Sequence, residues 1–133
     1  MYNAPMQAKD VRIGKDLVAA SAIPLVLAIL DEGESYGYAI LKRIDELSGG
    51  ELEWTDGMLY PLLHRLDRLG YVEARWVSTE GSRRRRYYSI TDGGRSALLE
   101  QRRQWAVVSD ALQNAWHSLH LVSPTALSGA AEG

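Results

Sequence analysis

The sequence of 133 residues contains no cysteine, so neither disulfides nor thiolate zinc sites can hold its fold. No apolar run is long enough to span a bilayer, because the longest, Leu17–Leu30, is interrupted by Ser21 and Pro24 and falls short of the roughly 20 residues required. Residues 1–14 lack the basic segment and apolar core of a signal peptide. We expect a soluble, cytoplasmic protein with no membrane partner, made of one domain and an appended element.

The sequence also lacks the side-chain sets on which catalysis depends. We find no nucleophile beside a base and no glycine-rich loop that could cradle a phosphate. His117 and His120 are three residues apart on a predicted helix, but no third metal ligand accompanies them. The prediction is therefore that the protein is not an enzyme and holds no metal and no cofactor.

The sequence carries no net positive charge, but its basic side chains are concentrated in one segment. The formal net charge is −2, whereas residues 57–95 hold eight basic side chains against four acidic ones, and Arg83, Arg84, Arg85 and Arg86 are adjacent. A patch of one sign on an oppositely charged body can orient a polyanion. This segment predicts an anionic partner; a merely solvated arginine-rich strand is the alternative.

Apolar spacing predicts two helices before residue 50. In the first, Asp16 is the expected cap, Pro24 bends or interrupts the helix, and Gly33 ends it. Its apolar positions are Leu17, Ala20, Ile23, Leu27 and Leu30. The second covers residues 36–47, with Tyr36, Ile40, Ile44 and Leu47 on its apolar side.

A third helix over residues 55–69 is predicted by a leucine stripe, with Thr55 or Asp56 as its N-cap. The stripe comprises Leu59, Leu62, Leu63, Leu66 and Leu69, and the opposite face carries Tyr60, Pro61, His64, Arg65 and Arg68. Two strand patterns follow, over residues 71–77 and 83–90, joined by a turn over residues 79–82. They predict a two-stranded hairpin.

Strand alternation assigns the side chains of this hairpin. Tyr88 and Ile90 are expected to pack on the core, which leaves Arg83, Arg85 and Tyr87 freest to reach outward, with Arg84 and Arg86 long enough to join them. The tryptophans that flank the hairpin, Trp54 and Trp76, are expected to pack within the domain.

A long final helix is predicted from the cap Thr91 to about residue 120. Its seven-residue pattern places Leu98, Trp105, Leu112 and Leu119 on one row and Gln101, Val108, Ala115 and Val122 on the next. A sustained apolar stripe on a terminal helix needs a partner surface. We therefore predict a homodimer through Leu98, Trp105, Val108, Leu112, Ala115 and Leu119.

The expected fold is mainly α with a small β-hairpin: a winged helix-turn-helix followed by a C-terminal dimerisation helix. Its predicted parts are an N-terminal extension (1–15), the DNA-binding domain (16–91), the dimerisation helix (92–122) and a disordered tail (123–133). In such a fold the third helix enters the major groove of DNA and the hairpin, or wing, lies along the backbone or minor groove. Candidate DNA-binding residues are Thr55, Tyr60, Pro61, His64, Arg65, Arg68, Arg83, Arg84, Arg85, Arg86 and Tyr87.

Three stretches of the sequence resemble the PadR family of bacterial transcriptional regulators. They are Ser35–Ile40, Asp56–Leu66, and Arg84–Thr91 followed by Gly94 and Arg95; the resemblance covers about Leu17 to Ala115. It implies a homodimeric winged-helix repressor that dimerises, as short members do, through one C-terminal helix. Tyr36 stands where many relatives have His and Met58 where many have Thr, which bears on base preference rather than on the fold.

The resemblance also suggests a small-molecule site. In some short relatives an indole near this position lines a cavity between subunits and stacks on planar aromatic compounds, which makes Trp105, Val108, Leu17 and Ala20 candidate effector-binding residues. A tryptophan that simply fills the dimer core is an equal alternative.

The predicted function is a sequence-specific transcriptional regulator, a repressor relieved by a small effector, which binds an inverted repeat in double-stranded DNA. The alternative is a winged-helix adaptor that binds protein and no DNA.

Overall fold

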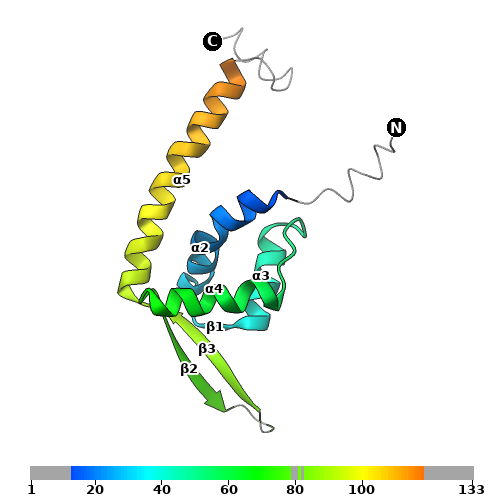
Figure 1. Cartoon of the computed structure of the whole chain (residues 1–133), viewed down its shortest axis with the longest axis vertical. Helices are drawn as coiled ribbons and strands as arrows, with labels where there is room; N and C mark the ends of the chain where they lie inside the picture. Colours follow the sequence, from blue (N-terminus) through cyan, green and yellow to red (C-terminus); the bar gives the residue numbers. More distant parts are fainter. Residues whose placement is uncertain (1–12, 79–80, 82, 119–133) are drawn as a thin grey trace, which may run out of the picture. The chain divides into compact units, whose positions relative to one another are not determined.

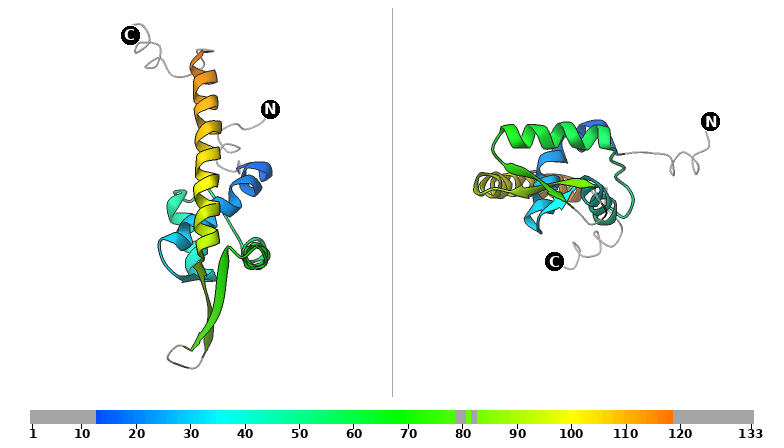
Figure 2. Two further views of the ribbon diagram at one scale, coloured as in Figure 1. Left: turned by 90° about the vertical axis from the view of Figure 1, so that its left-hand side faces the viewer. Right: turned by 90° about the horizontal axis from the view of Figure 1, so that it is seen from below.

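The structure, a computed structural model, describes residues 13–78, 81 and 83–118. The elements follow in the order α2 (Lys15–Asp31), β1 (Ser35–Tyr36), α3 (Gly37–Leu47), α4 (Asp56–Arg68), β2 (Val72–Ser78), β3 (Arg84–Ile90) and α5 (Asp92–Ser118). The long β2–β3 hairpin projects beyond helices α2, α3 and α4 (Figure 1), as a view from the side confirms (Figure 2). Helices and a hairpin in this order confirm the predicted winged-helix architecture.

Three helices and the sheet share one apolar core. Helix α2 continues through Pro24, so the proline does not interrupt it. The buried side chains come from α2, α3, α4, the sheet and the start of α5: Val26, Leu27, Ile29, Leu30, Ile40, Ile44, Leu59, Leu63, Leu66, Val72, Tyr88, Ile90 and Leu98. Four residues of the predicted apolar stripes are exposed instead. They are Leu17 and Ala20 near the start of α2, Leu47 at the end of α3, and Leu69 directly after α4.

The sheet has three strands rather than the predicted two. Strand β1 pairs antiparallel with β3, with Ser35 opposite Tyr88 and Tyr36 opposite Tyr87, so β3 is the central strand in the order β1-β3-β2. Most of the predicted turn at 79–82 lies outside the described residues, although Gly81 has a φ of 95°, which favours glycine. The extra strand ties the base of the wing to the start of α3.

The wing is joined to α5 at Thr91, whose side-chain hydroxyl makes two hydrogen bonds. Its hydroxyl accepts a hydrogen bond from the Gly94 amide at 3.0 Å and donates one to the Gly70 carbonyl at 2.6 Å, which confirms Thr91 as an N-cap. Gly94 is buried, and a Cβ there would collide with the Tyr71 carbonyl oxygen. The corner therefore requires both the hydroxyl and the glycine.

Two compact units divide the chain, residues 1–98 and 99–133. The first includes the opening turns of α5, where Gly94 and Leu98 are buried. The second begins at Leu99 and holds the rest of this 27-residue helix. Most of the predicted extension (1–15) and all of the predicted tail (123–133) lie outside the described residues. Within the described part of the chain, no helix combines the length and apolar character needed to cross a bilayer.

Candidate nucleic-acid interface

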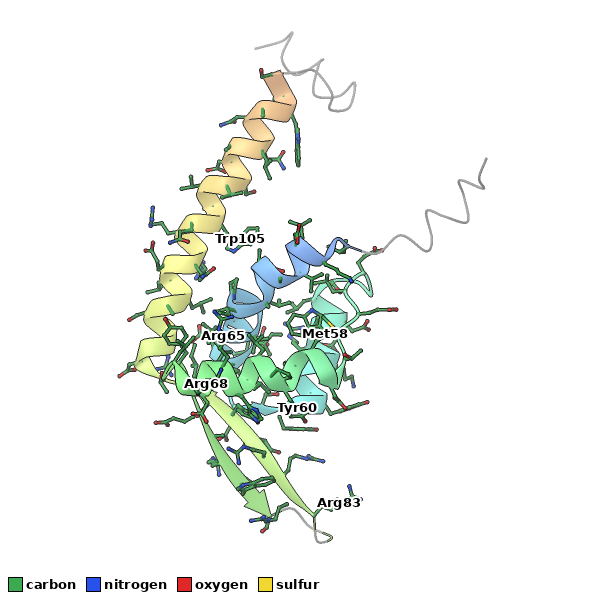
Figure 3. All side chains as sticks on the ribbon, in the orientation of Figure 1. Met58, Tyr60, Arg65, Arg68, Arg83 and Trp105 are labelled. Atoms are coloured by element: carbon green, nitrogen blue, oxygen red, sulfur yellow. The ribbon has the colours of Figure 1, made fainter. Side chains whose placement is uncertain are left out.

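Helix α4 presents a polar face opposite its leucines. Tyr60, Pro61, His64, Arg65 and Arg68 are all exposed, whereas Leu59, Leu63 and Leu66 are buried beneath them. Figure 3 labels Tyr60, Arg65 and Arg68 along α4. Pro61 lies inside the helix rather than at its start, because α4 begins at Asp56. The sequence thus predicted correctly which side chains of α4 are exposed.

The N-terminus of α4 is capped through backbone atoms only. Thr55 is the N-cap, and its carbonyl oxygen accepts hydrogen bonds from the amides of Met58 and Leu59, both at 3.0 Å. Its side chain makes no capping hydrogen bond, so the expected hydroxyl cap is absent. The exposed hydroxyl of Thr55 is left at the end of the helix where the macrodipole favours negative charge.

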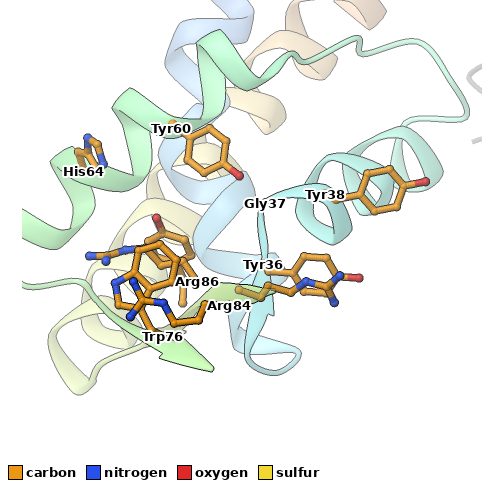
Figure 4. A pocket seen from close by; sticks show the side chains of 10 residues that line it. Tyr36, Gly37, Tyr38, Tyr60, His64, Trp76, Arg84 and Arg86 are labelled. Atoms are coloured by element: carbon orange, nitrogen blue, oxygen red, sulfur yellow. The ribbon is translucent and has the colours of Figure 1, made fainter. Parts of the chain in front are cut away.

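Tyr60 reaches from α4 to the first residue of α3. Its hydroxyl lies against Gly37, so close that a Cβ on Gly37 would clash with it, and Figure 4 shows the hydroxyl pointing toward this glycine. Partial burial, together with the carboxylate of Asp56 and the phenol of Tyr88, raises the pKa of Tyr60. A tyrosine phenol is protonated at neutral pH even without this shift, so the hydroxyl can donate a hydrogen bond.

One face of the wing carries two arginines stacked on an indole. Trp76 on β2 is paired with Arg86 on β3, so alternation places Arg84, Arg86 and Tyr88 on the same face as Trp76. The guanidinium carbons of Arg84 and Arg86 lie 4.6 and 5.2 Å from the Trp76 ring. The prediction that Trp76 packs within the domain is wrong, because it is 51% exposed; Trp54, in contrast, packs against the core.

The opposite face of the wing holds a second aromatic cluster. The Arg85 guanidinium lies 4.0 Å from the Tyr36 ring, and the rings of Tyr36 and Tyr87 meet edge to face at 5.3 Å. Tyr87 is consequently part-buried, which corrects its expected outward position. Glu34 accepts two hydrogen bonds from Arg75, and these lower the pKa of the Glu34 carboxyl. This ion pair neutralises Arg75 but not Arg85.

The polar face of α4 and the wing border a common depression of about 650 Å³, which we call the wing groove. Five aromatic side chains, one histidine, one glycine and three arginines line it: Tyr36, Tyr38, Tyr60, Trp76, Tyr88, His64, Gly37, Arg84, Arg85 and Arg86. Figure 4 shows Tyr60 and His64 on α4 across from the Arg84, Arg86 and Trp76 group. The groove therefore combines guanidinium donors with aromatic surface, a combination suited to a polyanion with planar bases.

The structure brings some of the predicted DNA-binding residues together and leaves others apart. Tyr60, His64, Arg84, Arg85 and Arg86 line the wing groove. The other candidates lie outside the groove. Thr55 at the cap of α4 and Pro61, Arg65 and Arg68 within this helix are exposed. Arg83 is exposed near the end of the hairpin (Figure 3), and Tyr87 is packed against Tyr36. Trp76, Tyr36, Tyr38 and Gly37 were missed as groove residues, although Tyr36–Tyr38 lie in a motif noted from the sequence.

The predicted dimerisation residues lie along α5 as follows. Leu98 is buried, Trp105 is part-buried, and Val108, Leu112 and Ala115 are exposed, while Leu119 lies outside the described residues. Three further large apolar side chains on α5, absent from the prediction, are also exposed: Leu99, Val107 and Trp116. Of the other candidate effector residues, Leu17 and Ala20 are exposed on α2.

Comparison with known proteins places this fold. Residues 26–100 match the model of the transcriptional regulator PadR-like family. The Escherichia coli transcriptional regulator YqjI is 27% identical over 89 residues, which are 67% of this chain and 41% of that protein. A transcriptional regulator structure from Clostridium thermocellum is 27% identical with a TM-score of 0.70, covering 77% of this chain and 96% of that one.

A PadR family regulator structure from Eggerthella lenta is 33% identical with a TM-score of 0.66, over 75% of this chain and 85% of that one. The fold is thus that of winged-helix transcriptional regulators. The chain belongs to the PadR-like family of transcriptional regulators, as the family model, which matches more than half of its length, establishes.

Proposed function

We propose that this protein is a homodimeric, sequence-specific DNA-binding repressor, which a small planar aromatic molecule releases from an inverted-repeat operator, and that it acts in the cytoplasm. The observation that carries DNA binding is the wing groove. There the exposed side chains of α4 and three consecutive wing arginines, Arg84, Arg85 and Arg86, border one depression. A winged-helix adaptor for proteins has no evident use for this cationic lining.

The chemistry of the groove divides into reading and anchoring. Tyr60 and His64 on α4 can hydrogen-bond base edges or phosphates, and Arg65 and Arg68 extend the same exposed face. The wing arginines present planar donor sets that match phosphate oxygens. Phosphate contacts would supply most of the affinity, which should therefore fall steeply as salt rises.

The dimer is supported by the apolar side chains of α5. Leu112 and Val108 are about half exposed, as are Val107 and Trp116, and such side chains along a terminal helix suit association with a second copy of the same helix. A two-fold dimer would hold two α4 helices at a fixed separation. They must lie about one duplex turn apart, roughly 34 Å, to enter successive major grooves.

Release by an effector would act on that separation. A ligand held between subunits by Trp105 and Val108, with Leu17 and Ala20 of α2, can shift the dimer only if it binds one geometry better than the other. A planar aromatic ligand suits the indole of Trp105, which is part-buried and therefore not fully covered.

The test is the salt dependence of DNA binding by the full-length protein and by an Arg84→Ala, Arg86→Ala variant. We expect weaker binding to every duplex, and a plot of log K against log salt that is flatter by about 0.9 for each phosphate that the variant no longer neutralises. The charge-matched control replaces Arg102 and Arg103, which are exposed on α5, and should leave the slope unchanged. Equal affinity at every ionic strength would show that the wing does not contact DNA.

A further inference from the structure

Trp76 is a large apolar side chain that is more than half exposed on the wing face bordering α4. A side chain so exposed contributes little to the core. Its ring is instead in contact with charge, since the guanidiniums of Arg84 and Arg86 lie 4.6 and 5.2 Å from it. The structure thus offers a role for this tryptophan other than packing.

Without the contact to Trp76, the positive charges of Arg84 and Arg86 would repel each other with nothing to offset the repulsion. Arg84 and Arg86 project from the same face of β3, two residues apart, and Arg85 lies between them in sequence. Like charges so close repel one another, and long side chains lose rotamer freedom when they are held in place. The negative ring face of an indole attracts both cations without cancelling their charge.

The geometry of stacking leaves the arginines able to bind. A guanidinium stacks through its flat face, while its N–H donors lie in its own plane and point outward from the edge. The Nε atom of Arg86 is buried, so the donors of this residue that can reach a phosphate are those at the outer end of the guanidinium. An arginine on Trp76 can therefore contact the ring and a phosphate oxygen at the same time, whereas an arginine held by a carboxylate has already used part of its donor set and has its charge compensated.

We propose that Trp76 is a positioning residue for DNA binding: its indole holds Arg84 and Arg86 in the orientation in which they contact backbone phosphates beside α4. This inference rests on the proposed function, because it specifies how the wing arginines are prepared for the duplex. The rings of Trp76 and Tyr36 then play matched parts on the two faces of the wing, with Tyr36 stacked on Arg85.

The experiment replaces Trp76 in the full-length protein by a heavily fluorinated tryptophan, which removes negative potential from the ring face and scarcely alters its shape. Binding to a fluorescein-labelled DNA duplex of arbitrary sequence is measured by anisotropy across a salt series, because phosphate contacts do not depend on sequence. We expect binding weaker by about two- to fivefold for each subunit on the duplex. The salt slope should not change, since the same phosphates are contacted less favourably.

Three further measurements separate positioning from structure. The thermal unfolding midpoint should be the same for the fluorinated and unmodified proteins, and Trp76→Phe should retain more affinity than Trp76→Leu. In an Arg84→Gln, Arg86→Gln background, fluorination of Trp76 should no longer change affinity, because the cations it acts on are gone.

The outcomes distinguish this inference from the proposed function. If the unmodified protein ignores DNA even at low salt, the proposed function fails and this inference fails with it. If the unmodified protein binds and fluorination leaves affinity unchanged, or tightens binding because the arginines leave the ring on the duplex, only the role of Trp76 is overturned.

Discussion

The contact between Gly37 and Tyr60 makes a prediction about the substitution Gly37→Ala. A Cβ on Gly37 would clash with the Tyr60 hydroxyl oxygen and would lie 2.8 Å from its ring carbon Cζ. The three nearest atoms to that Cβ all belong to Tyr60, so the tyrosine has to move. Because Tyr60 is already 38% exposed, it can swing toward solvent without disturbing the core.

The size of the effect depends on how much buried apolar area Tyr60 loses when it is displaced. An aromatic side chain buries roughly 150–250 Å² when fully covered, so the covered part of Tyr60 corresponds to at most about 4 kcal/mol at 25 cal/mol per Å². Partial displacement typically costs about 1–3 kcal/mol, and alanine gains up to about 1 kcal/mol over glycine in a helix. We expect Gly37→Ala to lower the free energy of unfolding by about 1–2 kcal/mol.

The decisive comparison is the same substitution in a Tyr60→Ala background, measured by urea unfolding. With the tyrosine removed, no atom of the described residues lies closer than 3.4 Å to the new Cβ, and Gly37→Ala should become neutral or stabilising by up to about 1 kcal/mol. Gly94→Ala is the matched control: its Cβ would meet the backbone oxygen of Tyr71, so it should destabilise equally in both backgrounds. If the effect of Gly37→Ala does not depend on Tyr60, the assigned contact is not the reason for the glycine.

Two other substitutions test the remaining features. Leu112→Glu puts a charge on the exposed apolar side of α5, so it should shift sedimentation from dimer to monomer and abolish specific DNA binding. The control, Gln113→Glu, adds the same charge beside the predicted stripe and should change neither. A Leu112→Glu variant that remains dimeric would refute the helix as the interface. Thr91→Ala removes the hydroxyl that bridges Gly94 and Gly70, and we expect it to lower the free energy of unfolding by about 1–2 kcal/mol. The control, Thr91→Ser, keeps the hydroxyl. A serine variant as unstable as the alanine variant would exclude the cap as the cause.

The sequence predicted what local pattern can encode. Four helices and a hairpin were found from apolar spacing and turn residues, and Thr91 was found as a cap because hydroxyl residues satisfy the first amides of a helix. Strand β1 was not found, because two residues are too few to show alternation. Its partner in β3 is more than fifty positions away along the chain, and no local signal reports so distant a pairing.

The misplacement of Trp76 has a different cause. Aromatic side chains are usually assigned to the interior because they bury large apolar areas, and that rule is followed by Trp54, which packs against the core. Trp76 departs from it: the tryptophan is about half exposed, and its neighbour across the strand pair is an arginine, Arg86. Only the register of the hairpin reveals that neighbour, and the register depends on a turn whose length is not fixed by apolar pattern.

The two ways in which this chain holds its arginines explain how an acidic protein presents a cationic surface. Arg43, Arg75, Arg95 and Arg103 are each paired with a carboxylate among the described residues, and each pair removes a positive charge from the field of the protein. Arg84, Arg85 and Arg86 lie instead on the rings of Trp76 and Tyr36. A ring fixes a cation while leaving its charge intact, so stacking concentrates positive potential on the wing, where net charge alone would predict none.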